Sequence, residues 1–278
     1  MKMEDIEKHW RNWANEFDVD LRATTKTSTI KELEVNALYS AIVEFQPSAS
    51  TKETTPLDIL EVGSGNGHNC FSLSKRLTKS NFTGVDFISE MVSSANKQLA
   101  TYPDQKQFRF FEGNILKLQE HPNLKKDYDV VFTDRCIINV NSHELQNQAF
   151  DNLLSLTRGN GLVVLIENIK KTYDDQNQLR TSVGLPARTP DSFNLFLDED
   201  QFLFHCRSRA TLMAIKDFGS LHDLVLYVLV PMINDGKTDY DHPIVKATTQ
   251  LLLNNDFDLG NSFGHFGQNR LYVFKKEI

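Results

Sequence analysis

The sequence predicts an α/β fold with a mainly parallel sheet and helices on both of its faces. Two observations predict it: short apolar stretches alternate with amphipathic ones beyond residue 57, and a glycine-rich turn follows the first apolar stretch. Of the 278 residues, 40% are hydrophobic and 24% are charged. This composition is typical of a globular protein and argues against a disordered or fibrous chain.

Two amphipathic helices are predicted ahead of the sheet, over residues 6–17 and 30–45. Trp10, Trp13 and Phe17 share one face of the first helix. A linker rich in Ser, Thr and Pro follows over residues 47–56 and marks the first boundary of the chain. We therefore expect residues 1–46 to form a helical lid on the domain that follows.

Strands and helices alternate through the rest of the chain. The predicted strands are residues 57–62, 81–85, 108–112, 128–133, 162–167, 211–217 and 269–275. The predicted helices are one that ends near residue 77 and those over residues 89–102, 142–156 and 198–207. This alternation indicates βαβ units, whose crossovers are almost always right-handed.

Two segments do not fit the alternation. Residues 170–195 are polar, contain Gly and Pro, and are long for a plain connection. Residues 221–255 look like a mostly helical insertion. We expect one domain over residues 57–278, with cap insertions at about 170–200 and 218–266.

The glycine-rich turn has the spacing E-x-G-x-G-x-G, from Glu61 through Gly63 and Gly65 to Gly67. A dinucleotide-binding turn would have its third glycine at the position that His68 occupies. Gly63 and Gly65 let the backbone turn sharply and approach a ligand closely. Glu61 can accept hydrogen bonds from an ammonium group or from the amides of the loop. A plain connection between strand and helix is compatible with the same turn.

A carboxylate, Asp86, ends the second predicted strand. At this place in a nucleotide-binding βαβ unit, an acid can accept hydrogen bonds from both hydroxyls of a ribose. Asp86 is also compatible with capping the helix that begins near Ser89.

With these residues, the chain resembles the class I S-adenosylmethionine-dependent methyltransferase family over about residues 57–167. The resemblance implies a Rossmann-like fold with a seven-stranded sheet, S-adenosyl-L-methionine as cofactor and S-adenosyl-L-homocysteine as product. It assigns the glycine loop to the methionine part of the cofactor and Asp86 to its ribose. The cofactor-binding residues that it implies are Glu61, Gly63, Ser64, Gly65, Asn66, Asp86, Phe87, Ile88, Asn114, Ile115, Asp134 and Arg135.

The resemblance also distributes roles within this set. Phe87 or Ile88 would line the adenine, and the carbonyl of Asn114 would accept from the adenine amino group where Asp is commoner in the family. Residues just after the fourth strand, such as Arg135, would contact the methionine part and lie beside the substrate. Arg135 could clamp a carboxylate through two hydrogen bonds, or form an ion pair with the protein itself.

A narrower resemblance, to a bacterial small-molecule methyltransferase subgroup, rests on residues 21–27, 134–139 and 193–199. Within these motifs, the candidate substrate-binding residues are Arg22, Lys26 and Asn194. His222, which precedes Asp223, is the candidate general base for a hydroxyl acceptor. An amine acceptor with a free lone pair would need no base.

The resulting hypothesis is a methyltransferase that moves a methyl group to an oxygen or nitrogen of a small metabolite by direct in-line displacement. A sugar, a nucleotide sugar and a natural product are equally compatible acceptors. Three alternatives stay open: a protein or peptide methyltransferase, a nucleic-acid methyltransferase, and a non-enzymatic nucleotide-binding module. The net charge of −7 counts against a nucleic-acid partner, because such proteins normally present a basic face.

Three further features concern location and metals. No apolar run is long enough to span a bilayer, and the first residues lack the apolar core of a signal peptide. The three cysteines are scattered and form no C-x-x-C pair, so we expect free thiols and a cytoplasmic location. The histidines show no metal-ligand spacing, so no metal is expected. The sequence indicates no particular oligomeric state.

Overall fold

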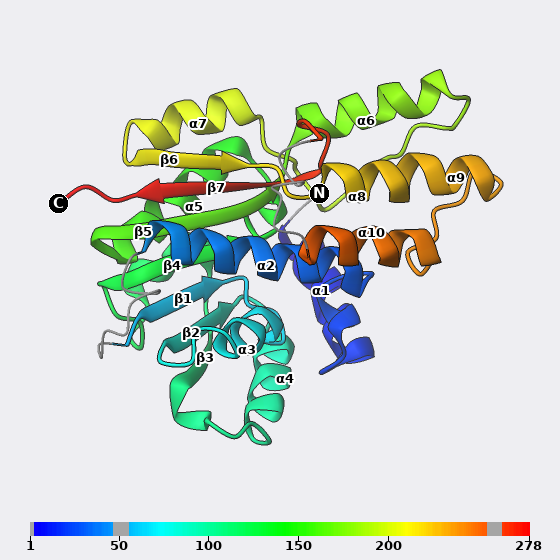
Figure 1. Cartoon of the computed structure of the whole chain (residues 1–278). Coiled ribbons are helices and arrows are strands. Elements are labelled where there is room, and N and C mark those ends of the chain that lie inside the picture. Colours follow the sequence, from blue (N-terminus) through cyan, green and yellow to red (C-terminus); the bar gives the residue numbers. More distant parts are fainter. Residues whose placement is uncertain (1–2, 47–55, 255–262) are drawn as a thin grey trace.

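The computed structural model describes residues 3–46, 56–254 and 263–278. Within these residues, seven strands form one sheet with the order β3-β2-β1-β4-β5-β7-β6 (Figure 1). The strands are β1 (Asp58–Val62), β2 (Asn81–Asp86), β3 (Phe108–Glu112), β4 (Tyr128–Asp134), β5 (Thr157–Asn168), β6 (Thr211–Lys216) and β7 (Asn269–Lys275). Neighbours among β1 to β5 pair in parallel, whereas β7 runs antiparallel to β5 and β6. The predicted fold class is confirmed.

Helices cover both faces of this sheet. The helices of the described residues are α1 (Met3–Phe17), α2 (Ser28–Phe45), α3 (His68–Ser74), α4 (Ser89–Leu99), α5 (His143–Leu156), α6 (Lys170–Ser182), α7 (Glu199–Arg207), α8 (Ser220–Leu224), α9 (Val230–Ile233) and α10 (Pro243–Leu253). Short turns are η1 (Leu21–Ala23), η3 (Gln105–Gln107), η4 (Ile115–Glu120), η5 (Ile137–Asn139) and the π-helical η6 (Val225–Leu229). One hydrophobic core lies between the sheet and α2, α3 and α4, and a second lies between the sheet and α5 and α7.

Strand β5 shows how both faces of the sheet are buried. Leu162, Val164 and Ile166 belong to the core beneath α2, α3 and α4, whereas Val163 and Leu165 belong to the core beneath α5 and α7. None of these five side chains has exposed surface. Burying each one stabilises the fold by about 1.5–3 kcal/mol relative to exposure. A strand that is apolar on both faces is therefore held firmly at the centre of the sheet.

Helix α6 forms where the sequence predicted only a polar connection. Its buried residues are Thr172, Tyr173, Gln176 and Arg180, which recur at helical spacing. Because three of these four side chains are polar, the apolar periodicity that reveals an amphipathic helix is missing. Gly184, with φ +80°, follows the helix and supplies the left-handed conformation that helix ends favour.

Helix α1 and the two segments predicted as cap insertions lie beyond the carboxyl ends of the parallel strands, whereas α2 packs on a face of the sheet (Figure 1). Helix α1 packs on α4 through a small cluster that includes Ala14, Ile88 and Met91. Helix α10 of the cap packs on α2. The predicted linker over residues 47–56 lies outside the described residues, apart from Pro56. In the described part of the chain, no helix has the length and apolarity that a membrane crossing requires.

Candidate functional site

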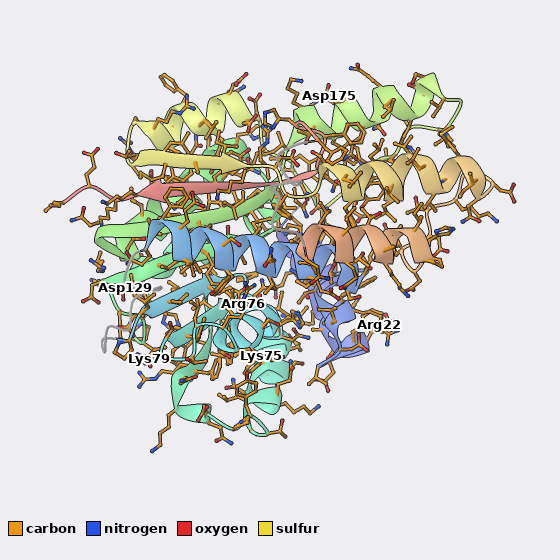
Figure 2. All side chains as sticks on the ribbon, viewed as in Figure 1. Arg22, Lys75, Arg76, Lys79, Asp129 and Asp175 are labelled. Carbon is orange, nitrogen blue, oxygen red and sulfur yellow. The ribbon has the colours of Figure 1, made fainter. Side chains whose placement is uncertain are left out.

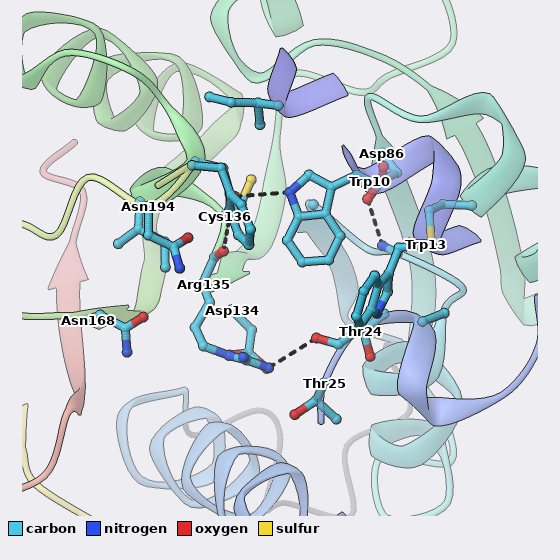
Figure 3. A pocket seen from close by; sticks show the side chains of 18 of the residues that line it. Trp10, Trp13, Thr24, Thr25, Asp86, Asp134, Arg135, Cys136, Asn168 and Asn194 are labelled. Carbon is cyan, nitrogen blue, oxygen red and sulfur yellow. Dashed lines mark hydrogen bonds and ion pairs between the residues drawn. The ribbon is translucent and has the colours of Figure 1, made fainter. Parts of the chain in front are cut away.

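A cavity of about 440 Å³ lies at the carboxyl ends of β1, β2 and β4 (Figure 3). Open α/β sheets bind ligands at this edge, where loops from neighbouring strands diverge. Glycine-loop residues line one part of the cavity, and residues of the lid and the cap line the rest. The volume falls within the usual range for small-molecule sites.

The glycine loop lines this cavity with Gly63, Ser64 and Gly65. The amides of Gly63 and Ser64 donate to the carbonyl of Val85 at 2.7 and 3.0 Å. Gly63 and Gly65 have φ values of +78° and +52°. A Cβ on Gly63 would lie 2.6 Å from Cys136 Sγ, and one on Gly65 would lie 2.4 Å from the methyl carbon of Thr24. Both positions therefore require glycine for conformation and for space.

Asn66, in the same loop, does not line the cavity. Its Nδ2 donates to the backbone carbonyls of Asp18 and Asp20, at 3.2 and 2.9 Å. Asn66 thus ties the glycine loop to the lid. Asn66 is therefore not placed for the predicted contact with a cofactor, because the sequence of a loop does not show which of its residues faces away from a cavity.

Asp86 lies at the end of β2 and lines the cavity with Phe87 and Ile88. Its Oδ2 accepts from the Gly65 amide at 2.7 Å, and its Oδ1 accepts from the Ile88 amide at 2.9 Å. Each oxygen keeps a further lone pair for a ligand hydroxyl. Burial raises the pKa of Asp86 to about 6, against the lowering effect of these amides.

Asn114 and Ile115 line the cavity after β3. Asn114 begins η4, because its Oδ1 accepts from the Leu116 amide at 2.8 Å. Contact with an adenine amino group would therefore use the second lone pair of this oxygen.

Glu61 lies at the floor of the cavity and is buried. Its carboxylate accepts from Asn69 Nδ2 at 2.7 Å and from Cys70 Sγ at 3.1 Å, rather than from the loop amides. Burial raises the pKa of Glu61 to about 8. Asn69 Oδ1 and Asp134 Oδ1 are buried and accept no hydrogen bond in the described structure, although Arg135 Nε lies 3.6 Å from the Asp134 oxygen, so both can accept from an ammonium group of a ligand.

Asp134 belongs to a group of four charges, which we call the charge quartet: the buried Lys31, Glu34 and Asp134, and the half-buried Arg135. Lys31 Nζ lies 2.5 Å from Asp134 Oδ2 and 2.7 Å from Glu34 Oε2. Arg135 Nε lies 3.0 Å from Glu34 Oε1 and 3.6 Å from Asp134 Oδ1. Burial disfavours the charged carboxylate of Asp134, yet the charges of Lys31 and Arg135 lower its pKa overall. The two cations and two carboxylates balance in charge.

Arg135 forms the ion pair that was one of its two predicted roles, and it also lines the cavity. Its backbone has a φ of +56°, which is uncommon for a residue with a Cβ. Lys31 and Glu34 were not predicted from the sequence as residues of the site. A signal was present, because both lie on the helix face that continues into buried Leu38 and Ala41.

The remaining predicted residues divide into two pairs. Lys26 and Asn194 line the cavity, and Lys26 forms an ion pair with Asp191 at 3.5 Å. Arg22 and His222 do not line it. Arg22 is exposed on the outer side of the lid, where it binds Asp20 (Figure 2).

His222 is fully buried between two polar side chains. Its Nε2 lies 3.2 Å from Thr29 Oγ1 and its Nδ1 lies 3.0 Å from Asp223 Oδ1. A general base must reach the proton of its substrate, so the structure does not support that role for His222. His9 and His68 do line the cavity, and burial lowers the pKa of both, that of His68 to about 4.

The aromatic face of α1 meets the cavity through two of its three predicted members, Trp10 and Trp13. Trp10 Nε1 donates to Asn139 Oδ1 at 3.0 Å, so α1 is tied to the turn after β4. Phe17 packs instead against the cluster that joins α1 to α4. Within the described residues, no three His, Cys, Asp or Glu side chains are grouped so as to hold a metal ion.

The structure fits the cofactor that the resemblance implies. A cradle at Gly63 and Gly65 admits no Cβ, and the orphaned oxygens of Asn69 and Asp134 match a ligand ammonium group. Asp86 offers a carboxylate for two hydroxyls.

Comparison with known proteins gives the family. Residues 54–215, more than half of the chain, match the family model of a methyltransferase domain. Arsenite methyltransferase of Rattus norvegicus is 33% identical over 88 residues, which make up 30% of this chain and 24% of that protein. The match thus spans about a quarter of that relative's length.

Solved structures with the same fold include two methyltransferases. One is magnesium protoporphyrin IX methyltransferase from Synechocystis PCC 6803 with bound SAH, with a TM-score of 0.53 and 14% identity over 89% of this chain and 84% of that chain. Another is geranyl diphosphate methyltransferase in complex with GPP and sinefungin, with a TM-score of 0.54 and 14% identity over 98% of each chain. The chain belongs to the class I S-adenosylmethionine-dependent methyltransferase domain family.

Proposed function

We propose that the protein transfers the methyl group of S-adenosylmethionine to an oxygen or nitrogen of a small metabolite. The observation that carries this proposal is that one continuous cavity is lined by the glycine loop and Asp86 as well as by residues of the lid and the cap. An acceptor held among lid and cap residues would share one enclosed space with the cofactor. A sugar, a nucleotide sugar or a natural product would be acceptors of suitable size.

The residues of the chain have separable roles in this proposal. Asp86 binds the ribose hydroxyls, the Gly63 and Gly65 backbone accommodates the methionine part, and the orphaned oxygen of Asp134 accepts from the ammonium group. Asn114 contacts the adenine. When bound, the cofactor supplies an activated methyl group. The protein therefore contributes binding, orientation and exclusion of water rather than a covalent intermediate.

We further propose that the part of residues 1–46 that precedes α2 acts as a lid, since α2 itself packs on the sheet, and that the segments at about 170–200 and 218–266 act as a cap. Three contacts support the lid: Trp10 with Asn139, Asn66 with the carbonyls of Asp18 and Asp20, and Thr24 against Gly65. Each contact joins the lid to a loop that lines or borders the cavity. Segments of this kind exclude water during a reaction and move to admit ligands.

Replacing Asp86 by alanine tests the cofactor site. We expect the affinity for S-adenosylhomocysteine, measured by calorimetry, to fall at least tenfold, because two charge-assisted hydrogen bonds worth about 1.5–3 kcal/mol are lost. The matched control is Asp175→Ala, which removes an exposed carboxylate of α6 (Figure 2). Unchanged affinity in Asp86→Ala, or binding of NAD in place of S-adenosylhomocysteine, would contradict the proposal. A methyl-transfer screen grouped by acceptor class then identifies the substrate.

The raised pKa of Asp86 predicts a pH dependence. Because the pKa is about 6, the carboxyl group is ionised above that pH and increasingly neutral below it. The ionised form makes the stronger hydrogen bonds with hydroxyl groups. We therefore expect the affinity for S-adenosylhomocysteine to weaken as the pH falls from 7.5 to 5. Asp86→Asn should bind weakly and with little change over this range, whereas an equal pH profile in both proteins would assign the effect to another group.

A further inference from the structure

The cap contributes an arginine, Arg188, to the wall of the cavity. Its guanidinium lies 3.5 Å from the ring centroid of Tyr227 and 4.9 Å from that of Tyr173. Its NH1 donates to Gln176 Oε1 at 2.9 Å, and its NH2 donates to Gln268 Oε1 at 3.0 Å. A guanidinium has five N–H donors, so these two bonds leave donors available to a ligand.

The orientation of this guanidinium is fixed by a second layer of hydrogen bonds. Gln176 Nε2 donates to Asp223 Oδ2 at 3.1 Å and to the carbonyl of Phe266 at 2.7 Å. The amide oxygen of Gln176 is therefore turned toward Arg188. Rings, amides and backbone together hold the arginine in one position, as recognition of a specific group requires.

No described carboxylate forms an ion pair with Arg188. Of the two acids that line this part of the cavity, Asp191 pairs with Lys26, and Asp223 bonds to His222, Gln176 and the Gln268 amide. Asp223 reaches Arg188 only through the two glutamines. By contrast, Arg135 and Lys31 in the same cavity are matched by carboxylates.

A second arginine adds to the positive charge at this place. Arg180 is buried, and its donors go to the backbone carbonyls of Pro186 and Tyr227 rather than to a carboxylate. Burial, together with the nearby charge of Arg188, lowers the pKa of Arg180. Arg180 does not line the cavity, so it adds positive charge behind Arg188, and the field of both cations favours an anion at Arg188.

We propose that Arg188 selects the methyl acceptor by binding an oxyanion of it, a carboxylate or a phosphate group. This inference rests on the proposed function, because it assumes that the cap side of the cavity holds the acceptor. Arginine suits such a role, since its planar fork donates two parallel hydrogen bonds to either kind of oxyanion. Acceptors that lack an anionic group would leave the guanidinium unpaired and bind less well.

The test measures anion binding directly. Benzoate, phenyl phosphate and the neutral benzyl alcohol are titrated into the purified protein, with and without S-adenosylhomocysteine. Fluorescence reports binding, because the two tryptophans of the chain, Trp10 and Trp13, both line the cavity. We expect one or both anions to bind at least tenfold more tightly than benzyl alcohol. Comparing benzoate with phenyl phosphate distinguishes the carboxylate from the phosphate.

Variants then assign the effect to Arg188. Arg188→Gln should lose at least tenfold in anion affinity while its S-adenosylhomocysteine affinity is unchanged. Arg188→Lys, which keeps the charge but not the fork, should retain a preference for anions over benzyl alcohol. The matched control is Arg76→Gln, since Arg76 also stacks on a tyrosine, 3.4 Å from the Tyr39 centroid, and bonds to Asn36, but lies outside the cavity (Figure 2).

The outcomes separate the two proposals. Wild-type protein that binds no anion more tightly than benzyl alcohol would overturn the role of Arg188, and so would Arg188→Gln with undiminished anion affinity. If Arg188→Gln fails to fold, Arg188→Lys decides: lysine lacks the planar fork, so its anion affinity should fall below that of the wild type, and an undiminished affinity would overturn the proposal. Failure of the wild type to bind S-adenosylhomocysteine would instead contradict the proposed function. The anion titration in the absence of S-adenosylhomocysteine would still test the role of Arg188.

Discussion

Replacing Lys31 by methionine should lower the free energy of unfolding by about 3–5 kcal/mol, as expected when one partner of a buried ion pair is removed. Lys31 is buried, and its ammonium group is the contact that Asp134 and Glu34 share. Without it, Arg135 alone would face two buried carboxylates. The measurement is urea unfolding at pH 7.5, monitored by circular dichroism.

The control for this substitution is Lys26→Met. Lys26 is exposed and pairs with Asp191 at 3.5 Å, so its loss should change stability by no more than about 1 kcal/mol. A cost below about 1 kcal/mol for Lys31→Met would show that the charge quartet contributes little to stability.

Substituting valine for Gly65 should abolish binding of S-adenosylhomocysteine, with at least a hundredfold loss of affinity by calorimetry. A β-branched residue is strained at a φ of +52°, and its Cβ would lie 2.4 Å from the methyl carbon of Thr24. Either the loop or the lid must shift, and both border the place of the methionine part. The backbone amide of Gly65 also donates to Asp86, so a shift of the loop would disturb the ribose site as well.

Gly184→Val is the control for Gly65→Val, because it introduces the same backbone strain without a steric clash. Gly184 has a φ of +80°, and nothing lies within 4 Å of a Cβ built on it. This variant should lose stability yet bind S-adenosylhomocysteine as the wild type does. Tight binding by Gly65→Val would mean that the glycine loop does not hold the cofactor.

The parts of the fold that local chemistry specifies could be predicted from the sequence. Strands β3 and β7 have the predicted bounds, because short apolar stretches between polar turns are clear signals. Asp86 was predicted correctly to end a strand beside the glycine loop, since both are encoded within one βαβ unit.

What the sequence did not reveal depends on contacts between distant segments. Lys31 and Asp134 are 103 residues apart in the chain, and only the packing of α2 over the strand ends brings them together. His222 stands beside an acid in the sequence, as a catalytic base often does, yet it lies in the interior against Thr29. Spacing along one chain shows which residues share a helix face, but not which neighbour that face meets.

The stretch between η1 and α2 has a consequence for the order of events in turnover. Thr24 lies against Gly65 on the cofactor side, and two residues later Lys26 pairs with Asp191 of the cap. One short stretch therefore borders both the glycine loop and the cap. A movement of this stretch would open the cofactor side and the cap side together, so that spent cofactor and methylated product would leave in one event. Departure of the products, rather than the methyl transfer itself, would then limit the rate, and a more viscous solvent would slow the enzyme.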